Sequence, residues 1–377
     1  MKKILFFSTV TGASFSGSER LWYSTALNLL DRTDIRVAVC AQAWSPVPDH
    51  HHKLRQAGAD LFLYDRRSKP SLLQRAARFA GERTGIARLE SWQRAALRFA
   101  PDLVVVSQGW WPECAAHYRF LSSFSCPKTY VTHAASEFRW FDEKTAAKAR
   151  RLLQDSPAIF FVSEANRSLV ELQLVQRLHN ARIVKNPIQG SLTPYPPAEN
   201  GRYCLACVGR YHVQAKGQDI LIRILAKDAW RARPLTIRLY GSGKDESLMR
   251  RWCDMFNLSS IEITGYEENI ERIYEHCHGL ILPSRHEGLP ISALEAMRCG
   301  RIVIATKVGT EEVVKDGETG FLAGGPSVPC VEEALERAWA ERAAWHEMGK
   351  NASDYFAQLY QGCNPVSDFA AALLALT

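Results

Sequence analysis

Two glutamates with seven residues between them lie in the segment LILPSRHEGLPISALEAM, residues 280–297. Glu287 comes before Pro290, and we expect a helix to begin near Leu289 or Pro290, because proline suits a first helical turn whose N–H groups are unpaired. Such a helix start attracts phosphate through those N–H groups and about half a positive charge. Glu295 would lie about five residues into the helix, roughly 8 Å along its axis. A carboxylate on each side of a bound diphosphate would suit a nucleotide-sugar, because both the ribose and the sugar offer hydroxyl donors.

The same two glutamates also fit surface carboxylates that flank an ordinary amphipathic helix, and the segment alone leaves both interpretations open. The run Leu280, Ile281 and Leu282 is typical of a strand covered on both faces. Pro283 ends that strand, and Gly288 allows the backbone to approach a ligand closely. A strand, a loop and a helix start are therefore the elements that would position the glutamates.

Strand-like apolar runs alternate with helix-period segments along the whole chain, which favours α/β domains with mainly parallel sheets and helices on both faces. In the first half we expect strands over residues 3–9, 35–41, 60–64, 102–107, 129–133, 159–163 and 183–185. In the second half we expect them over residues 203–208, 235–240, 261–264, 279–282 and 302–305.

The length of 377 residues and a hydrophobic content of 46% predict about two domains with ample core material. Residues 188–200, rich in proline and glycine, would link a domain over 1–187 to one over 201–355. Residues 356–377 would form a C-terminal helical stretch. The two Rossmann-like domains are expected to face each other across a cleft.

Several segments closely resemble the family 4 glycosyltransferases, which are retaining enzymes of the GT-B fold. The strongest are EGLPISALEAM at 287–297, the run CGRIVIATKVGTEEVVKDGETGFL at 299–322, and VGRYHVQAKGQDILI at 208–222. Shorter matches are LYGSG at 239–243, ITGY at 263–266, FVSEANRS at 161–168 and IVKNPI at 183–188. Before about residue 130 the resemblance is loose and depends on SGSERLWYSTALNLL and THAASEF. The resemblance also implies that the last helix crosses back onto the first domain.

The resemblance implies a role for each matched residue of the second domain. Arg210 and Lys216 would bind the diphosphate, Glu287 would contact the sugar, and Glu295 would take the ribose hydroxyls. Ligands of open parallel sheets bind beyond the carboxyl ends of the strands, and the loop after residues 203–208 lies at such an end. Without the match, Arg210 and Lys216 could equally be two solvated loop cations. The further donor-binding candidates, from the helix start and a glycine loop, are Gly288, Leu289, Ile291, Gly241 and Gly243.

Two candidates lie in the first domain. His133 ends a predicted strand in YVTHAASEF, and the resemblance places a histidine there beside the donor sugar. A histidine at a strand end is often structural, so that alternative stays open. Gly17 matches a small-residue loop near the phosphates, although Ser16 stands where the family more usually has a second glycine. With Glu287, Arg210 and Lys216, His133 completes the predicted catalytic set.

No metal and no cofactor are expected. The chain has no D-x-D motif, which the other main glycosyltransferase architecture commonly uses to hold Mn²⁺ or Mg²⁺. Cys204 and Cys207 form the one C-x-x-C, but a strand would turn them to opposite faces, and no second pair follows at zinc spacing. The histidine run at 50–52 lacks spaced partners. The ten cysteines are expected to be reduced core thiols of a cytoplasmic protein.

Charge is concentrated in residues 53–98, which hold 11 lysines and arginines against four acidic residues, while the whole chain has a net charge of +7. Its arginines alternate with apolar residues such as Leu72, Phe79 and Trp92, which predicts one or two basic amphipathic helices. These helices could lie on the anionic inner face of a membrane and suit a lipid-linked acceptor, or could be ordinary packed helices with a solvated basic face. Nucleic acid is not an expected partner, because the region contains no recognisable nucleic-acid-binding motif. No stretch is long enough for a membrane span.

The sequence therefore predicts a retaining, hexosyltransferase-type glycosyltransferase. It would move a sugar from a nucleoside diphosphate to a hydroxyl of a glycan or a lipid-linked acceptor, in cell-surface polysaccharide or glycolipid assembly. Two alternatives stay open. One is a sugar-nucleotide 2-epimerase or hydrolase on the same fold, and the other is a catalytically silent GT-B subunit that binds a partner or glycan.

Overall fold

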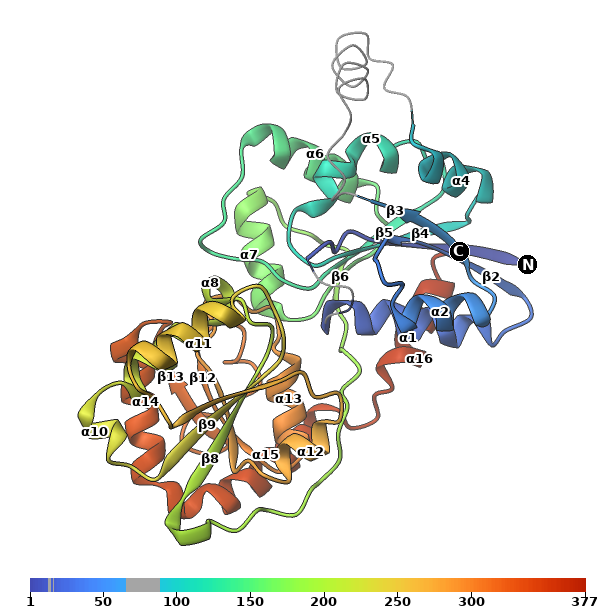
Figure 1. Ribbon diagram of the computed structural model, residues 1–377. Coiled ribbons are helices and arrows are strands. Elements are labelled where there is room, and N and C mark those ends of the chain that lie inside the picture. Colours follow the sequence, from blue (N-terminus) through green and yellow to red (C-terminus); the bar gives the residue numbers. More distant parts are fainter. Residues whose placement is uncertain (13–14, 16, 66–88) are drawn as a thin grey trace. The chain divides into compact units, whose positions relative to one another are not determined.

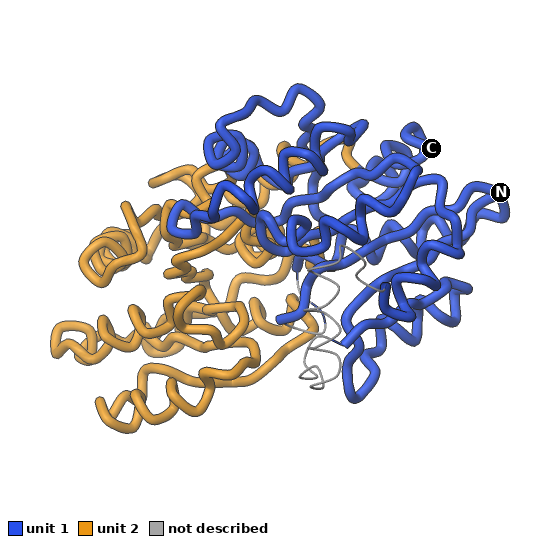
Figure 2. Tube along the Cα trace, turned by 90° about the horizontal axis from the view of Figure 1, so that it is seen from above, with its two compact units in different colours: residues 1–187, 364–377 blue, residues 188–363 orange. Residues whose placement is uncertain are grey.

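The computed structural model describes residues 1–12, 15, 17–65 and 89–377. The chain divides into two compact units. Unit 1 comprises Met1–Pro187 and Asn364–Thr377, and unit 2 comprises Ile188–Cys363 (Figures 1 and 2). The last helix therefore belongs to unit 1, whereas residues 356–363 and the segment 188–200 belong to unit 2. Most of the predicted basic region, residues 66–88, and Ser16 lie outside the described residues.

The described residues of unit 1 contain a seven-stranded parallel sheet of order β3-β2-β1-β4-β5-β6-β7. Its strands are β1 (Lys2–Ser8), β2 (Ile35–Gln42), β3 (Asp60–Tyr64), β4 (Leu103–Gln108), β5 (Lys128–Thr132), β6 (Ile159–Phe161) and β7 (Ala181–Ile183). All seven predicted strands of this half are confirmed, with ends that differ by at most two residues. The carboxyl ends of β1, β4 and β5 lie side by side at the centre of the sheet.

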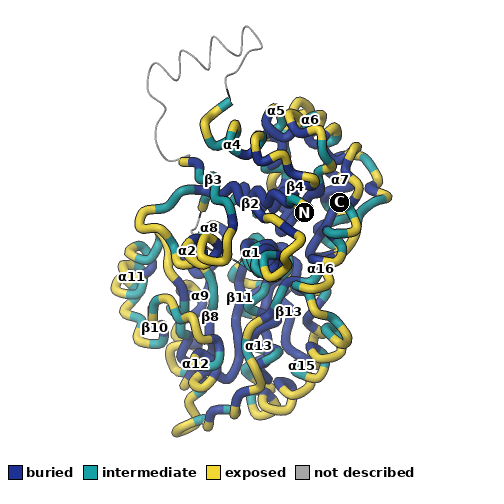
Figure 3. Tube along the Cα trace, turned by 90° about the vertical axis from the view of Figure 1, so that its right-hand side faces the viewer, coloured by how far each residue is buried: buried dark blue, intermediate teal, exposed yellow. Residues whose placement is uncertain are grey.

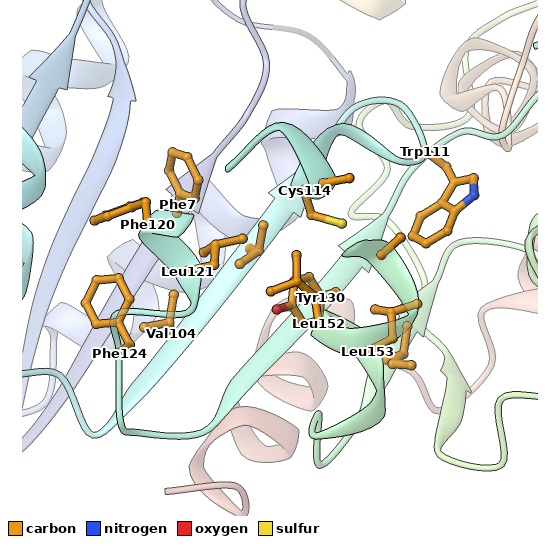
Figure 4. Close-up of a cluster of buried hydrophobic side chains, with 14 of the residues drawn as sticks. Phe7, Val104, Trp111, Cys114, Phe120, Leu121, Phe124, Tyr130, Leu152 and Leu153 are labelled. Atoms are coloured by element: carbon orange, nitrogen blue, oxygen red, sulfur yellow. The ribbon is translucent and has the colours of Figure 1, made fainter. Parts of the chain in front are cut away.

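Helices cover both faces of the unit 1 sheet, because successive strand residues point to opposite faces. Leu5 and Phe7 of β1 join a cluster with Phe120, Tyr130 and others on one face (Figure 4). Ile4 and Phe6 join the cluster on the other face. The helices are α1 (Gly17–Leu30), α2 (Asp49–Gln56), α4 (Ser91–Phe99), α5 (Tyr118–Leu121), α6 (Glu143–Gln154), α7 (Glu164–Leu174) and α16 (Pro365–Leu374), with a 3-10 turn, η1 (Glu113–His117). Helix α16 packs against α1.

Unit 2 contains a six-stranded parallel sheet of order β10-β9-β8-β11-β12-β13. The strands are β8 (Tyr203–Val208), β9 (Leu235–Tyr240), β10 (Ile261–Gly265), β11 (Gly279–Leu282), β12 (Ile302–Thr306) and β13 (Gly320–Ala323). Five of them were predicted. The sixth, β13, was missed, because four residues that begin with glycine give too short a pattern to recognise.

The helices of unit 2 also cover both sheet faces, so that the strands are buried while the outer helix surfaces are exposed (Figure 3). They are α8 (Val213–Lys216), α9 (Gln218–Leu225), α10 (Asp228–Arg231), α11 (Glu246–Met255), α12 (Ile270–Tyr274), α13 (Ile291–Arg298), α14 (Val328–Ala340) and α15 (Trp345–Leu359). Cys204 and Cys207 lie in the two opposite core clusters, as the strand alternation predicts.

Candidate functional site

The candidate site of unit 2 lies at the carboxyl ends of β8 and β11, two paired central strands. Lys216, the last residue of α8, follows β8, and Glu287 follows β11. The Lys216 Nζ donates to Glu287 Oε1 over 2.6 Å, and the Ser284 Oγ donates to the same oxygen over 2.7 Å. The two charged side chains are only 21% and 10% exposed, so the surrounding water screens their attraction weakly.

A second ion pair fixes the loop that carries Glu287. Arg285 donates two hydrogen bonds to Asp219, from Nη1 to Oδ1 over 2.7 Å and from Nη2 to Oδ2 over 2.8 Å. The backbone N–H groups of Arg285 and His286 donate to the Ala215 carbonyl over 2.8 and 3.2 Å. The loop after β11 is therefore held against α8 and the start of α9. Sequence reasoning missed Arg285 and Asp219, although Asp219 is the aspartate of the KGQD match.

Two glycines allow the backbone segments of the site to approach each other. Gly217 has a φ of 68°, and a Cβ there would lie 2.1 Å from the Pro283 carbonyl oxygen. Gly309 has a φ of 72°, and a Cβ there would lie 2.3 Å from the Gly288 carbonyl oxygen. A side chain at either position would push the loop after β11 out of place, because both contacts are with rigid backbone.

Helix α13 places a positive backbone end beside this loop. The helix begins at Ile291 with Pro290 as its N-cap, one residue after the later and two residues after the earlier of the two predicted starts, Pro290 and Leu289. No side chain caps this end, so N–H groups of its first turn are available to an anion. Glu295 is the fifth helical residue and is 3% exposed. It is a buried residue of the helix rather than a surface carboxylate.

The remaining predicted residues of unit 2 lie in the loops after β8, β9 and β11. The Arg210 side chain is exposed and takes part in no ion pair within the described part of the chain. Its backbone carbonyl accepts a hydrogen bond from the buried Gln218 Nε2 over 2.8 Å.

The glycines after β9 bring two loops together. Gly241 packs against the Gly209 carbonyl and Gly243 against the Tyr211 backbone, so the loops after β8 and β9 are in direct contact. Gly288 is buried, whereas Leu289 is half-buried.

This arrangement is chemically suited to an anion. One exposed guanidinium, one lysine and one open helix end lie in neighbouring loops of a single sheet edge. Among the described residues, no group of three or more His, Cys, Asp or Glu side chains could hold a metal ion. All ten cysteines are free thiols, and six are buried.

Unit 1 carries His133 immediately after β5. Its Nε2 lies 3.1 Å from the Ser107 Oγ of β4, and its Nδ1 has no hydrogen-bond partner among the described residues. Burial lowers the pKa of His133 to about 4, so the imidazole is neutral near pH 7. Gly17 is the first residue of α1.

Glu19, which sequence reasoning missed, is a second buried titratable group in unit 1. It accepts hydrogen bonds from the Ser8 Oγ over 2.8 Å and from the Trp22 Nε1 over 3.0 Å. Burial raises the pKa of Glu19 to about 7. Glu19 lies two residues after Gly17, in a segment whose resemblance to the family is loose. The sequence therefore did not indicate that this side chain is buried.

Comparison with solved structures identifies the fold. HepE of Anabaena, solved in complex with UDP, matches with a TM-score of 0.74 at 18% identity, and the match covers 100% of both chains. The fold is GT-B. A further structure of HepE, in complex with UDP-glucose, matches the GT-B chain with a TM-score of 0.73 at 17% identity and again covers both chains fully.

Within the GT-B chain, residues 202–341 match the family model of glycosyl transferases group 1. An uncharacterized glycosyltransferase of Methanocaldococcus jannaschii is 33% identical over 157 residues, which cover 41% of this chain and 42% of that protein. The GtfA subunit of a UDP-N-acetylglucosamine–peptide N-acetylglucosaminyltransferase from Streptococcus pneumoniae is 27% identical over 195 residues, which cover 50% of this chain and 38% of that protein. The chain thus spans less than half the length of these two relatives. Among the described residues, no helix has the length and apolar character to cross a membrane.

Proposed function

We propose that the chain is a retaining glycosyltransferase and that unit 2 binds its nucleoside diphosphate sugar. The observation that carries this proposal is the Lys216–Glu287 pair beside the uncapped end of α13. A lysine and a helix end recognise a diphosphate, and a carboxylate recognises sugar hydroxyls. The match of residues 202–341 to glycosyl transferases group 1 supports the same assignment.

Each residue has a proposed task in the transfer. Arg210, Lys216 and the N–H groups near Ile291 would stabilise the negative charge that grows on the diphosphate as the glycosidic bond breaks. Glu287 would accept a hydrogen bond from the sugar, and Glu295 one from the ribose. An acceptor hydroxyl would attack the oxocarbenium-like sugar from the face that the phosphate leaves, and the leaving phosphate would take its proton. His133 would contribute a neutral imidazole, because its pKa is lowered to about 4.

We propose uridine as the donor base. HepE was solved with UDP and with UDP-glucose, and the GtfA subunit is part of an enzyme named for a UDP-sugar. A glycan or lipid-linked acceptor, a role in polysaccharide or glycolipid assembly and a location at the cytoplasmic side of a membrane are parts of the same proposal. Since the cations would do the work of a divalent ion, turnover should persist when a chelator is present.

A turnover assay tests this function. The protein is incubated with UDP-glucose, UDP-N-acetylglucosamine or GDP-mannose, with and without a mixture of glycan acceptors, and release of the nucleoside diphosphate is measured. We expect release that increases with acceptor from the wild-type protein and from Lys227→Ala, which removes a different lysine–glutamate pair of unit 2. Lys216→Ala should lose it. Equal turnover in Lys216→Ala and Lys227→Ala would refute the proposed site.

A further inference from the structure

The segment between β5 and α6 of unit 1 (Figure 1) carries two large aromatic side chains that are exposed to solvent. Phe138 is 71% exposed and Trp140 is 65% exposed. Two exposed aromatic rings in one short segment offer apolar area that a ligand could bury, and burial of a side chain of this size is worth about 1.5–3 kcal/mol. The segment begins at His133, directly beyond the carboxyl end of β5, where ligands of open parallel sheets bind.

The backbone of this segment is fixed by two buried side chains of α7. The Gln173 Nε2 donates to the carbonyls of Ser136 and Arg139 over 3.0 and 3.1 Å. The Asn166 Oδ1 accepts from the backbone N–H of Ala135 over 3.0 Å. The aromatic rings are therefore presented by a loop with a defined conformation, which reduces the entropy that binding must overcome.

Trp140 is also held individually. Its indole Nε1 donates to the Glu137 carbonyl over 2.8 Å. The polar edge of the indole is thus bonded to the protein's own backbone, while most of the ring surface stays in contact with water. Next to it, the Arg139 guanidinium lies 5.5 Å from the centre of the Trp110 ring.

We propose that Trp140, together with Phe138, is a stacking platform for a pyranose ring of the acceptor glycan. The C–H groups on one face of a pyranose carry small positive charges, and the face of an aromatic ring is negative. The two surfaces are flat and of similar size, so they attract each other and exclude water together. This inference rests on the proposed function and narrows its acceptor to a molecule with at least one exposed sugar face.

The charges of the segment favour a sugar over an anionic membrane as the occupant. Residues 137–144 hold three carboxylates and two basic side chains, whereas membrane surfaces attract clusters of basic residues. A tryptophan in a membrane interface also turns its N–H toward the wet headgroups, and the Trp140 N–H is already bonded to Glu137. A neutral ligand with an apolar face fits both observations.

Saturation-transfer NMR tests the platform with simple probes. The methyl pyranosides of glucose, galactose and N-acetylglucosamine are each added in excess to the wild-type chain, Trp140→Ala, Trp140→Phe and Leu172→Ala. Leu172 is a matched control, because it is an apolar side chain of unit 1 that is 63% exposed. We expect transfer to the sugar C–H protons with the wild type and Leu172→Ala. The affinity for the pyranosides should fall on the order of tenfold in Trp140→Ala, which corresponds to about 1.4 kcal/mol of lost stacking. It should fall less in Trp140→Phe, which keeps an aromatic ring.

The platform is refuted if no pyranoside receives saturation from the wild type, or if Trp140→Ala matches it. Cosedimentation with phosphatidylglycerol–phosphatidylethanolamine vesicles tests membrane binding in the same variants. Trp140-dependent binding to vesicles without binding to sugars would also refute the platform. UDP affinity, measured by calorimetry on the same variants, should not change in Trp140→Ala. Normal UDP binding with no sugar effect would refute the platform alone. Sugar binding in a protein that binds no nucleotide would refute the donor site and leave the platform standing.

Discussion

Lys216 and Glu287, which are 71 residues apart in the chain, form an ion pair of 2.6 Å at the carboxyl edge of the unit 2 sheet. Lys216 was predicted to bind phosphate and Glu287 to contact the sugar, and in the structure the two bind each other. A diphosphate would have to compete with Glu287 for the ammonium group. If the diphosphate held Lys216, the Glu287 carboxylate would become available to a sugar hydroxyl. Under the proposed function, the pair would thus connect phosphate binding to sugar binding.

This competition predicts different effects for the two partners. Glu287→Ala should leave the affinity for UDP unchanged or increase it, because Lys216 no longer has an internal acceptor, while sugar transfer is abolished. Isothermal calorimetry with UDP and a turnover assay on the same preparation measure both effects. Loss of UDP affinity in Glu287→Ala, with the protein still folded by circular dichroism, would argue that Glu287 positions Lys216 rather than competing for it.

The ion pair between Arg285 and Asp219 should affect UDP binding, although neither residue is assigned a ligand contact. Asp219→Asn removes the charge that accepts both Arg285 hydrogen bonds, which leaves a half-buried guanidinium without its carboxylate. We expect UDP affinity to fall by about five- to tenfold, because the loop after β11 is less well ordered before binding. The measurement is again calorimetric, and a parallel variant, Asp228→Asn at an exposed position of α10, should not change the affinity.

The sequence was sufficient to predict most of the fold. Its apolar runs reproduce β8, β9 and β11 to the residue, because these buried parallel strands are continuous and are bounded by polar or glycine-containing turns. Strand β13 was missed, because Gly320–Ala323 is too short to show a period. Helix α13 starts after Pro290, since proline serves there as the N-cap and not as the first helical residue.

The site could be predicted only in part. Motif matches located Lys216 and Glu287, but their pairing depends on how two loops pack. That packing requires the Arg285–Asp219 ion pair and the close contact of Gly217 with Pro283. Such contacts join residues distant in sequence, and no local pattern encodes them. The buried state of Glu19 was unpredictable for the same reason.

Arg301 is predicted to be a major determinant of the stability of unit 2. It is buried, and its guanidinium donates to backbone carbonyls that include those of Cys277, Thr193 and Tyr274. Arg301→Met would leave several of these acceptors unpaired, at a cost of at least about 3 kcal/mol. Urea unfolding followed by hydrogen exchange should show lost protection in unit 2. Arg223→Met, at an exposed position of α9, is the control, and equal stability of the two variants would contradict this role.

Glu19 predicts a pH dependence for unit 1. Its pKa is raised to about 7, so its contribution to stability is fully present below the unfolded pKa near 4.5 and is lost as the pH rises through 7. The loss amounts to at most about 3 kcal/mol. Glu19→Gln should therefore match the wild type at about pH 5 and exceed its melting temperature at about pH 9. If the melting temperatures of the two proteins instead changed equally with pH across this range, Glu19 would not titrate as described.

His133 should change stability with the opposite sign. Its folded pKa is lowered to about 4, so its contribution is present above the unfolded pKa near 6.5 and is lost as the pH falls toward 4. NMR of ring-labelled histidine, with His133→Gln to assign the signal, should show a neutral imidazole down to about pH 5. A midpoint near 6.5 would mean that the ring is reached by water.

Calorimetric titration of UDP into the wild type, Lys216→Ala and Lys227→Ala tests the donor site most directly. We predict binding to the wild type and Lys227→Ala with equal affinity, and an affinity on the order of tenfold to a hundredfold weaker in Lys216→Ala, since a charge-assisted hydrogen bond contributes about 1.5–3 kcal/mol. Equal affinity in all three proteins would contradict the assignment of the diphosphate to Lys216.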